Sequence, residues 1–318
     1  MNNEEKALKI QKIFFPTWLK RKKQIKDDSN RIVHYTSAEA GLSIIENREI
    51  WMREKSAMND YSEAKYGEIL LYKSPSREIF VNALNGVFPK AIEKIDHHLG
   101  ITLNQADIGV YISCFSEHKD SEDLNGRLSM WRAYGGDTGV AIVFNNKHFV
   151  NPEAKVGIYT SPVEYLDQKQ YDNKLNEMTS NIVEETEFLR SFGNEEFSLI
   201  VSQALLFSIL CIKHPGFSEE LEWRVLSVPT IHNVEDFLIP HVACIKGTPQ
   251  TIYKIPLKNR EDLNLKNLEV SEFVDRVIIG PSENPKLIKQ VFVKSLKTVG
   301  FKDPEKRVFI SDIPLRSK

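Results

Sequence analysis

The chain has 318 residues, of which 42 are basic and 44 acidic, so its formal net charge is −2. A hydrophobic fraction of 41% with 17 Phe, 10 Tyr and 4 Trp supplies a sizeable core and excludes a mainly disordered protein. The near-zero charge argues against a protein that holds nucleic acid through a broad positive field. We therefore expect a globular protein whose partners are small ligands or other proteins.

The predicted elements begin with a helix and a basic run in residues 1–30, which we interpret as an N-terminal helical adapter. A strand from Arg31 to Tyr35 then leads into a helix from Ala38 to Asn47, whose start matches the capping box Thr36 to Glu39. Further strands are expected at residues 49–52, 107–115, 139–144, 156–160, 163–165, 220–227, 242–246, 251–256, 275–280 and 307–310. Further helices are expected to begin at residue 60 and to cover residues 74–98, 167–213 and 282–299.

This order of elements indicates an α+β protein with a mixed or antiparallel central sheet surrounded by helices. The continuous helical character of residues 167–214 predicts a helical insertion, in which residues 197–212 are apolar on nearly every side. We expect residues 31–318 to form a single domain that contains this insertion.

Three features of the sequence predict a cytoplasmic protein that does not associate with membranes. Cys114, Cys211 and Cys244 are widely spaced and odd in number, so neither a disulfide framework nor a cysteine zinc site is expected. The early apolar cluster is interrupted by Pro16 and lacks the pattern of a signal peptide. No stretch approaches the roughly 20 apolar residues of a membrane span. The oligomeric state is beyond what the sequence predicts.

Residues 220–227 alternate polar and apolar side chains with the period of a strand. Trp223 and Val225 fall on one face, whereas Glu222 and Arg224 fall on the other. A carboxylate and a guanidinium are therefore expected side by side on this strand.

Motifs of the common nucleotide-binding loops, zinc proteases and serine hydrolases are absent from the sequence. Polar residues instead recur beside aromatic ones at the predicted strand ends. Four patches carry this pattern: His34-Tyr35-Thr36; Asn59-Asp60 with Glu63; Cys114-Phe115-Ser116-Glu117 followed by Met130-Trp131-Arg132 and Tyr134; and Glu220 with Glu222-Trp223-Arg224.

In this order, the patches resemble a bacterial family catalogued as a domain of unknown function, DUF2971. The resemblance extends from about residue 31 to residue 285 and includes Gly139 and the late element Ile278-Ile279-Gly280. Tyr61 departs from the family pattern, which usually has proline there, and this change loosens the loop without removing its polar groups. The family label names no activity.

A second resemblance suggests one. His34-Tyr35-Thr36-Ser37, the helix after it and the short strand Ile50-Trp51-Met52 look like the start of ADP-ribosyltransferases of the DNA- and RNA-modifying toxin type. The resemblance implies an ADP-ribosyltransferase-like sheet and NAD, a small-molecule nucleotide, as the substrate, and it leaves a protein or nucleic-acid target open. It also implies that His34 holds a ribose hydroxyl, that Trp131 or Tyr134 stacks on a ring, and that Glu222 is the late-strand glutamate.

Cleavage of the bond between nicotinamide and ribose builds an oxocarbenium-like cation, which a carboxylate can stabilise. We therefore assign Glu222, His34 and Tyr134 as candidate catalytic residues. The candidate NAD-binding residues are Tyr35, Thr36, Asn59, Asp60, Ser116, Trp131, Arg132 and Arg224, the two arginines being placed for the pyrophosphate. The expected function is an NAD-consuming enzyme, an ADP-ribosyltransferase or an NAD glycohydrolase, acting in a toxin or anti-phage defence system.

Two other functional classes stay open. A metal-dependent nuclease or hydrolase would bring Asp60, Glu63, Glu117 and Glu222 together as oxygen ligands, although the spacing does not require it. A non-catalytic module would bind a nucleotide or a protein through an aromatic pocket that lacks a placed glutamate.

The candidate residues also have structural interpretations. His34 and Trp131 are of types that often lie in a core, and Asn59 and Asp60 can cap the following helix. Glu222 can form a structural ion pair with Arg132 or Arg224. Only their three-dimensional arrangement separates these interpretations from a role in a site.

Overall fold

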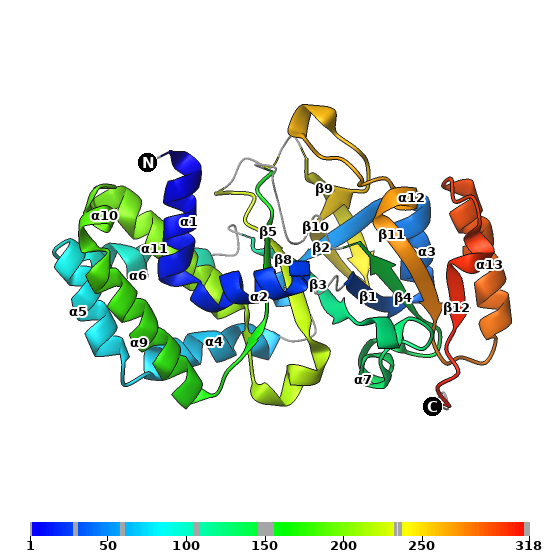
Figure 1. Ribbon diagram of the computed structural model, residues 1–318, viewed down its shortest axis with the longest axis horizontal. Coiled ribbons are helices and arrows are strands. Elements are labelled where there is room, and N and C mark those ends of the chain that lie inside the picture. Colours follow the sequence, from blue (N-terminus) through cyan, green and yellow to red (C-terminus); the bar gives the residue numbers. More distant parts are fainter. Residues whose placement is uncertain are drawn as a thin grey trace. The chain divides into compact units, whose positions relative to one another are not determined.

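The computed structural model describes residues 2–27, 31–57, 61–104, 109–145, 156–231, 234 and 237–314 (Figure 1). The chain divides into two compact units, each assembled from three segments of the sequence. Unit 1 comprises residues 1–23, 55–110 and 161–218, and unit 2 comprises residues 24–54, 111–160 and 219–318. Contacts between segments far apart in the sequence therefore build both units.

Unit 1 is mainly helical. Its longer helices are α1 (Asn3–Phe14), α2 (Pro16–Asp27, which continues beyond residue 23), α4 (Tyr61–Lys73), α5 (Arg77–Val87), α6 (Ala91–Asn104), α9 (Gln168–Glu184), α10 (Thr186–Arg190) and α11 (Asn194–Leu210). Its other described elements are the short turns η1 (Lys55–Ala57) and η4 (Pro215–Glu220, which continues beyond residue 218 into unit 2) and the parallel pair of β6 (Glu164–Tyr165) and β7 (Ile212–Lys213).

The helices of residues 167–214 belong to unit 1 together with the N-terminal helix. The apolar helix α11 packs against α4 and α6, and α9 packs against α1 and α5. The amide of Asn181 on α9 donates to the carbonyl oxygen of Ile13 on α1 at 3.2 Å. The predicted insertion, residues 167–214, thus supplies most of the segment 161–218 of unit 1. The predicted adapter contributes residues 1–23 to the same unit.

Unit 2 is built around a sheet. Its strands are β1 (Arg31–Ser37), β2 (Glu49–Glu54), β3 (Tyr111–His118), β4 (Gly139–Phe144), β5 (Tyr159–Pro162), β8 (Glu222–Ser227), β9 (Ile239–Ile245), β10 (Thr248–Pro256), β11 (Val274–Ile279) and β12 (Val308–Ile310). The order is β12-β11-β4-β1-β3-β2-β10-β9, and β8 lies between β3 and β5. β11 and β12 are parallel, whereas the ladders of β1, β2, β3, β4, β8, β9 and β10 are antiparallel.

Strand β3 makes ladders with three other strands. One of its edges pairs with β8 along the strand, as far as Ser116 opposite Glu222. Its other edge pairs first with β1, up to Val33 opposite Ser116, and then with β2, where Arg53 is opposite Ile112. β1 and β2 therefore separate from each other along β3.

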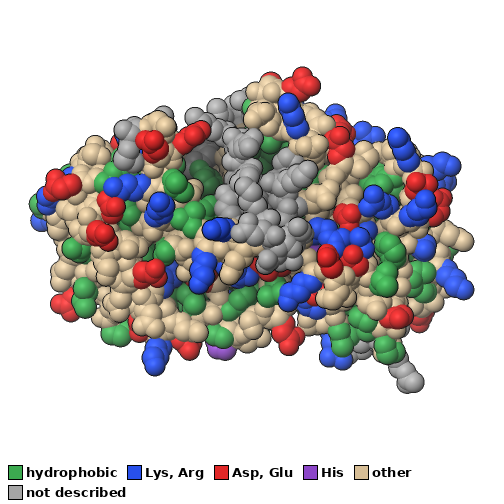
Figure 2. Space-filling model, viewed as in Figure 1, with side chains coloured by type: hydrophobic (Ala, Val, Ile, Leu, Met, Phe, Trp, Pro, Cys, Tyr) green, Lys and Arg blue, Asp and Glu red, His purple; other side chains and the backbone are tan. Residues whose placement is uncertain are grey.

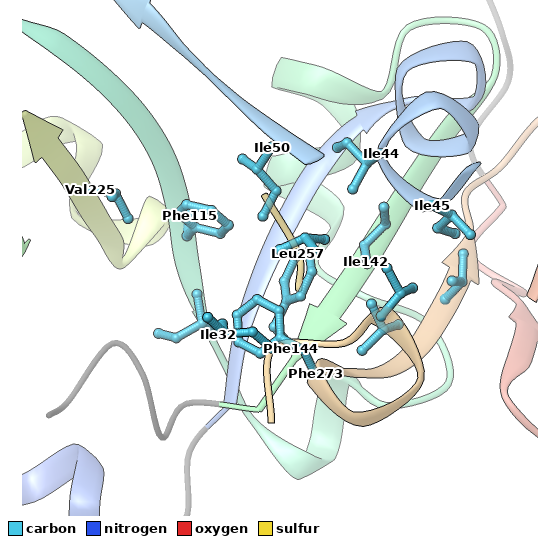
Figure 3. Packing of buried hydrophobic residues seen from close by; sticks show 14 of the residues in the cluster. Ile32, Ile44, Ile45, Ile50, Phe115, Ile142, Phe144, Val225, Leu257 and Phe273 are labelled. Atoms are coloured by element: carbon cyan, nitrogen blue, oxygen red, sulfur yellow. The ribbon is translucent and has the colours of Figure 1, made fainter. Parts of the chain in front are cut away.

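Each face of the sheet carries its own cluster of apolar side chains. Helices α3 (Ala38–Asn47) and α13 (Pro285–Thr298) pack on the face with the larger cluster, which we call the α3 face. Figure 3 shows members of this cluster from β1, β2, β3, β4, β8 and α3. The opposite face is covered by α7 (Leu128–Met130) and the π-helical turn η3 (Trp131–Gly135), and we call it the α7 face. Because strand residues alternate, β1 sends Ile32 to the α3 face and Val33 and Tyr35 to the α7 face.

The remaining elements in the described part of unit 2 are short. They are η2 (Asp120–Glu122), η5 (Glu261–Leu263), α12 (Val270–Phe273) and η6 (Pro304–Lys306). Figure 2 shows Lys and Arg side chains interspersed with Asp and Glu on the described part of the surface in view, consistent with a net charge near zero. In the described part of the chain, no helix combines the length and the apolar character that a membrane span requires.

The predicted α+β class with a mostly antiparallel sheet is confirmed, and two local predictions are corrected. The N-cap of α3 is Ser37, whose Oγ accepts from the amide of Ala40 at 3.2 Å. Thr36 is not the cap because β1 continues through Ser37, which pairs with Gly139. Strand β3 covers Tyr111–His118 rather than residues 107–115, since its ladder with β1 extends to His118.

Gly67 on α4 provides a test of the packing in unit 1. A Cβ atom at Gly67 would lie 2.4 Å from the carbonyl oxygen of Ile209 on α11, and this backbone atom can move only with its helix. We expect Gly67→Ala to lower the free energy of unfolding by about 1–3 kcal/mol. Gly86→Ala on α5 is the control, because a Cβ there meets nothing within 4 Å. Equal melting temperatures of the two variants, measured by circular dichroism, would contradict this contact.

Candidate functional site

The ladder between β3 and β8 brings two of the predicted motifs side by side. Phe115 lies opposite Trp223, and Ser116 lies opposite Glu222. Directly opposed residues of an antiparallel ladder point to the same face of the sheet. Phe115 and Trp223 belong to the cluster of the α3 face, so Ser116, Glu222 and Arg224 lie on the α7 face.

Glu222 and Arg224 form an ion pair on that face. Nε of Arg224 donates to Oε1 of Glu222 at 2.8 Å, and Nη2 lies 3.4 Å from Oε2. Glu222 is 4% exposed and Arg224 is 6% exposed. The prediction that a carboxylate and a guanidinium lie side by side on this strand is thereby confirmed. These two contacts hold the carboxylate in one orientation.

The side chain of Arg127 links the segment between β3 and α7 to the end of β3 and to the residues before β8. Its guanidinium donates to the carbonyl oxygens of Glu117 at 2.7 Å, Glu219 at 2.9 Å and Glu220 at 3.1 Å. The same group donates to both carboxylate oxygens of Glu122, at 2.8 and 3.1 Å. These contacts connect the end of β3 with the residues that precede β8.

Tyr35 lies beneath this segment. Its hydroxyl oxygen accepts from the backbone amide of Arg127 at 2.8 Å. Burial raises the pKa of the Tyr35 phenol, and the nearby charge of Glu122 raises it further. The phenol is therefore neutral at physiological pH and supports the backbone of the covering segment.

Trp131 is enclosed by glycine backbone. Its ring is 2% exposed, its Nε1 donates to the carbonyl oxygen of Asn125 at 2.8 Å, and its ring meets that of Tyr35 edge to face. A Cβ at Gly126 would lie 2.7 Å from this ring, and a Cβ at Gly280 would lie 2.8 Å from it. The tryptophan and these glycines form one packing unit, so the ring is a core element and not a surface for stacking.

Tyr134 and Arg132 lie in the more exposed part of the same turn. The hydroxyl of Tyr134 donates to Oε1 of Glu220 at 3.1 Å, and the side chain is 36% exposed. Arg132 is exposed. Since Glu220 precedes Glu222 by two residues, Tyr134 marks the accessible edge of the site.

His34 and Thr36 lie on the α3 face. The carbonyl oxygen of Cys114 is 2.8 Å from Nδ1 of His34, and because a carbonyl only accepts, Nδ1 carries the proton. The His34 ring also contacts the Phe115 ring, with centroids 5.3 Å apart. The γ-methyl of Thr36 lies near Gly41 of α3. These two candidates are therefore separated from Glu222 by the sheet.

Asn59 and Asp60 lie outside the described residues, as does the side chain of Glu63. Glu117 accepts from Nε1 of Trp223 at 3.0 Å on the α3 face. Glu117 and Glu222 are the two predicted metal ligands whose side chains are described, and they point to opposite faces of the sheet. No cluster of three or more potential metal ligands occurs among the described residues.

Sequence reasoning missed Arg127 and Glu122. Arg127 binds mainly backbone oxygens, which have no signature in the side-chain pattern. The one available signal is its position directly after Gly126 and shortly before the Met130-Trp131 motif. That position indicates a constrained turn, but it does not identify the partners.

Comparison with known families supports one of the two resemblances. Residues 130–225 match the model of a family described as "Protein of unknown function (DUF2971)". The matched segment includes Trp131, Glu222 and Arg224, so it supports the resemblance to this family over that part of the chain. No curated protein and no solved structure matches the chain.

The environment of His34 predicts a dependence of stability on pH. Desolvation lowers the pKa of this imidazole, against the opposing effect of its bond to Cys114. When the pH falls below the unfolded-state value of about 6.5, the unfolded chain takes up a proton that the folded chain does not, and stability decreases.

Between about pH 8 and pH 5.5, we expect the wild type to lose up to about 1.4 kcal/mol more than His34→Gln, whose amide keeps a neutral donor. Urea unfolding at both pH values measures this difference. Parallel losses in the two proteins would contradict a lowered pKa.

Proposed function

We propose that this protein cleaves the bond between nicotinamide and ribose in NAD, with Glu222 as the catalytic carboxylate. The observation that carries the proposal is the buried ion pair of Glu222 and Arg224. It provides an oriented carboxylate at the start of β8, and the exposed Tyr134 contacts Glu220, two residues before Glu222.

The reaction needs such a carboxylate. The bond from ribose C1′ to the nicotinamide nitrogen breaks, and its electron pair leaves with nicotinamide, so positive charge develops on the ribose. A carboxylate held in place before the reaction stabilises this charge without reorganising, and its effect is larger where water is largely excluded. Water or a nucleophile of a target then forms the new bond at C1′ and loses a proton.

The candidate residues divide into two groups in this proposal. Tyr134, Arg132 and Ser116 are on the same face as Glu222, where Tyr134 stacks on a ring and Arg132 meets the pyrophosphate. Arg224 orients Glu222. The other described candidates hold the scaffold: His34, Tyr35, Thr36 and Trp131 pack in the sheet and its clusters.

The positions of Glu117 and Glu222 also bear on the alternative of a metal-dependent nuclease or hydrolase. Glu117 and Glu222 point to opposite faces, and Glu117 is engaged by Trp223. A centre that uses both carboxylates would require the β3–β8 ladder to change register. The NAD proposal needs only the α7 face.

Substitution of Glu222 tests the function directly. We expect Glu222→Gln to lower the rate of nicotinamide release from NAD by about 100-fold or more, because glutamine keeps the shape but not the charge. Glu305→Gln, which removes an exposed carboxylate on η6, is the control and retains the wild-type rate. Circular dichroism verifies that both variants are folded.

Three outcomes are informative. No release by the wild type, or equal release by Glu222→Gln, would contradict the proposal. Free ADP-ribose as the product indicates a glycohydrolase. ADP-ribose attached to a protein or a nucleic acid indicates a transferase.

Tyr134 allows the stacking role to be tested separately. Tyr134→Phe keeps the ring and loses the hydroxyl that donates to Glu220, so we expect a KM for NAD close to that of the wild type. Tyr134→Ala removes the ring, and its KM should rise about 10-fold, as stacking on a base contributes about 1–3 kcal/mol. A rise of the same size in both variants would show that the hydroxyl, not the ring, matters.

A further inference from the structure

The residue directly before Glu222 has a strained backbone. Leu221 has a φ of 45°, in the left-handed region that favours glycine. A residue with a side chain is destabilised there by about 1–3 kcal/mol, and such a conformation persists only where neighbouring groups enforce it. Leu221 is only partly buried, so packing of its own side chain in the core does not account for it.

Two sets of hydrogen bonds hold this turn. The guanidinium of Arg127 binds the carbonyl oxygens of Glu219 and Glu220, the two residues before Leu221. The amide of Glu117 on β3 donates to the carbonyl oxygen of Leu221 at 2.9 Å. The backbone is therefore fixed immediately before and at the left-handed residue.

Arg127 is itself held by groups outside the turn. Glu122 binds two of its guanidinium nitrogens, the carbonyl of Glu117 binds a terminal one, and Tyr35 binds its backbone amide. Its orientation is thus set independently of residues 219–221. A rigidly held guanidinium can impose a conformation on a chain that would otherwise relax.

The strained turn lies between the two acidic residues of the site. On one side, Glu220 meets the hydroxyl of Tyr134, and on the other, Glu222 meets Arg224. Rotation of Leu221 toward an ordinary negative φ would change the direction in which the chain enters β8. Both carboxylates would then shift relative to a bound ribose.

We infer that Arg127 is a positioning residue, which keeps Leu221 in its left-handed conformation and thereby aims Glu222 at the reacting ribose. This inference rests on the proposed function. Arg127 does not contact the substrate, so its loss should lower kcat and leave KM nearly unchanged. A displacement of about 1 Å at a catalytic group can lower a rate by about 100-fold.

A second substitution separates positioning from a general loss of structure. Glycine adopts the left-handed conformation without strain, so Leu221→Gly lets the turn form without enforcement. We expect Arg127→Met to lower kcat by about 10- to 100-fold, with KM within about twofold of the wild type. The double variant with Leu221→Gly should recover at least about 10-fold of that loss. Arg260→Met removes an arginine that pairs with Asp262 on another loop, and it is the matched control.

A readout that needs no enzymatic activity completes the experiment. Hydrogen–deuterium exchange at the Glu117 amide, followed by NMR, reports its bond to Leu221. We expect Arg127→Met to accelerate this exchange by about 10-fold or more and Leu221→Gly to slow it again in the double variant.

The results distinguish the two levels of the proposal. Unchanged exchange in Arg127→Met, or an unchanged kcat in an active protein, would overturn the positioning role. A low kcat that Leu221→Gly does not recover would overturn it as well. If the exchange follows the expected pattern but the protein releases no nicotinamide, the result would support the effect of Arg127 on Leu221 and refute only the proposed cleavage of NAD.

Discussion

The register of β8 against β3 is the constraint on which the candidate site depends. Trp223 and Val225 are buried in the core of the α3 face, and this burial sends Glu222 and Arg224 to the opposite face. A shift of one residue would exchange the two sets and place the ion pair in the apolar core, at a large cost in free energy. The position of the carboxylate is therefore secured mainly by apolar burial of its neighbour.

Most residues of the family pattern maintain this arrangement rather than face a ligand. Trp131 packs against Gly126 and Gly280, and Tyr35 supports the backbone at Arg127. The Glu222 ion pair differs from them, because the desolvation of two charges offsets much of their attraction. Replacement of a buried ion pair by apolar residues of similar volume is often neutral or stabilising, so the pair is weak evidence of a contribution to stability.

The strand period of residues 220–227 was sufficient to predict that Glu222 lies beside Arg224, because both residues are on one element. It could not place His34 relative to Glu222. Their placement on opposite faces follows from the register of β1 against β3. This register is set by pairing between residues that lie about 80 positions apart in the sequence. The enclosure of Trp131 could not be predicted either, since Gly280, which packs on the ring, comes from a distant segment of the sequence. Arg127 was missed because its main partners are backbone oxygens.

The measurement that tests the central claim most directly is a crystal structure of the Glu222→Gln variant with NAD bound, since this substitution retains the shape of the site while slowing cleavage. We predict a hydroxyl of the nicotinamide ribose within hydrogen-bonding distance of the residue 222 side chain, with a ring of the substrate against Tyr134. NAD bound elsewhere, or an α7 face that takes up no nucleotide from a saturating solution, would contradict the assignment of this face as the catalytic site.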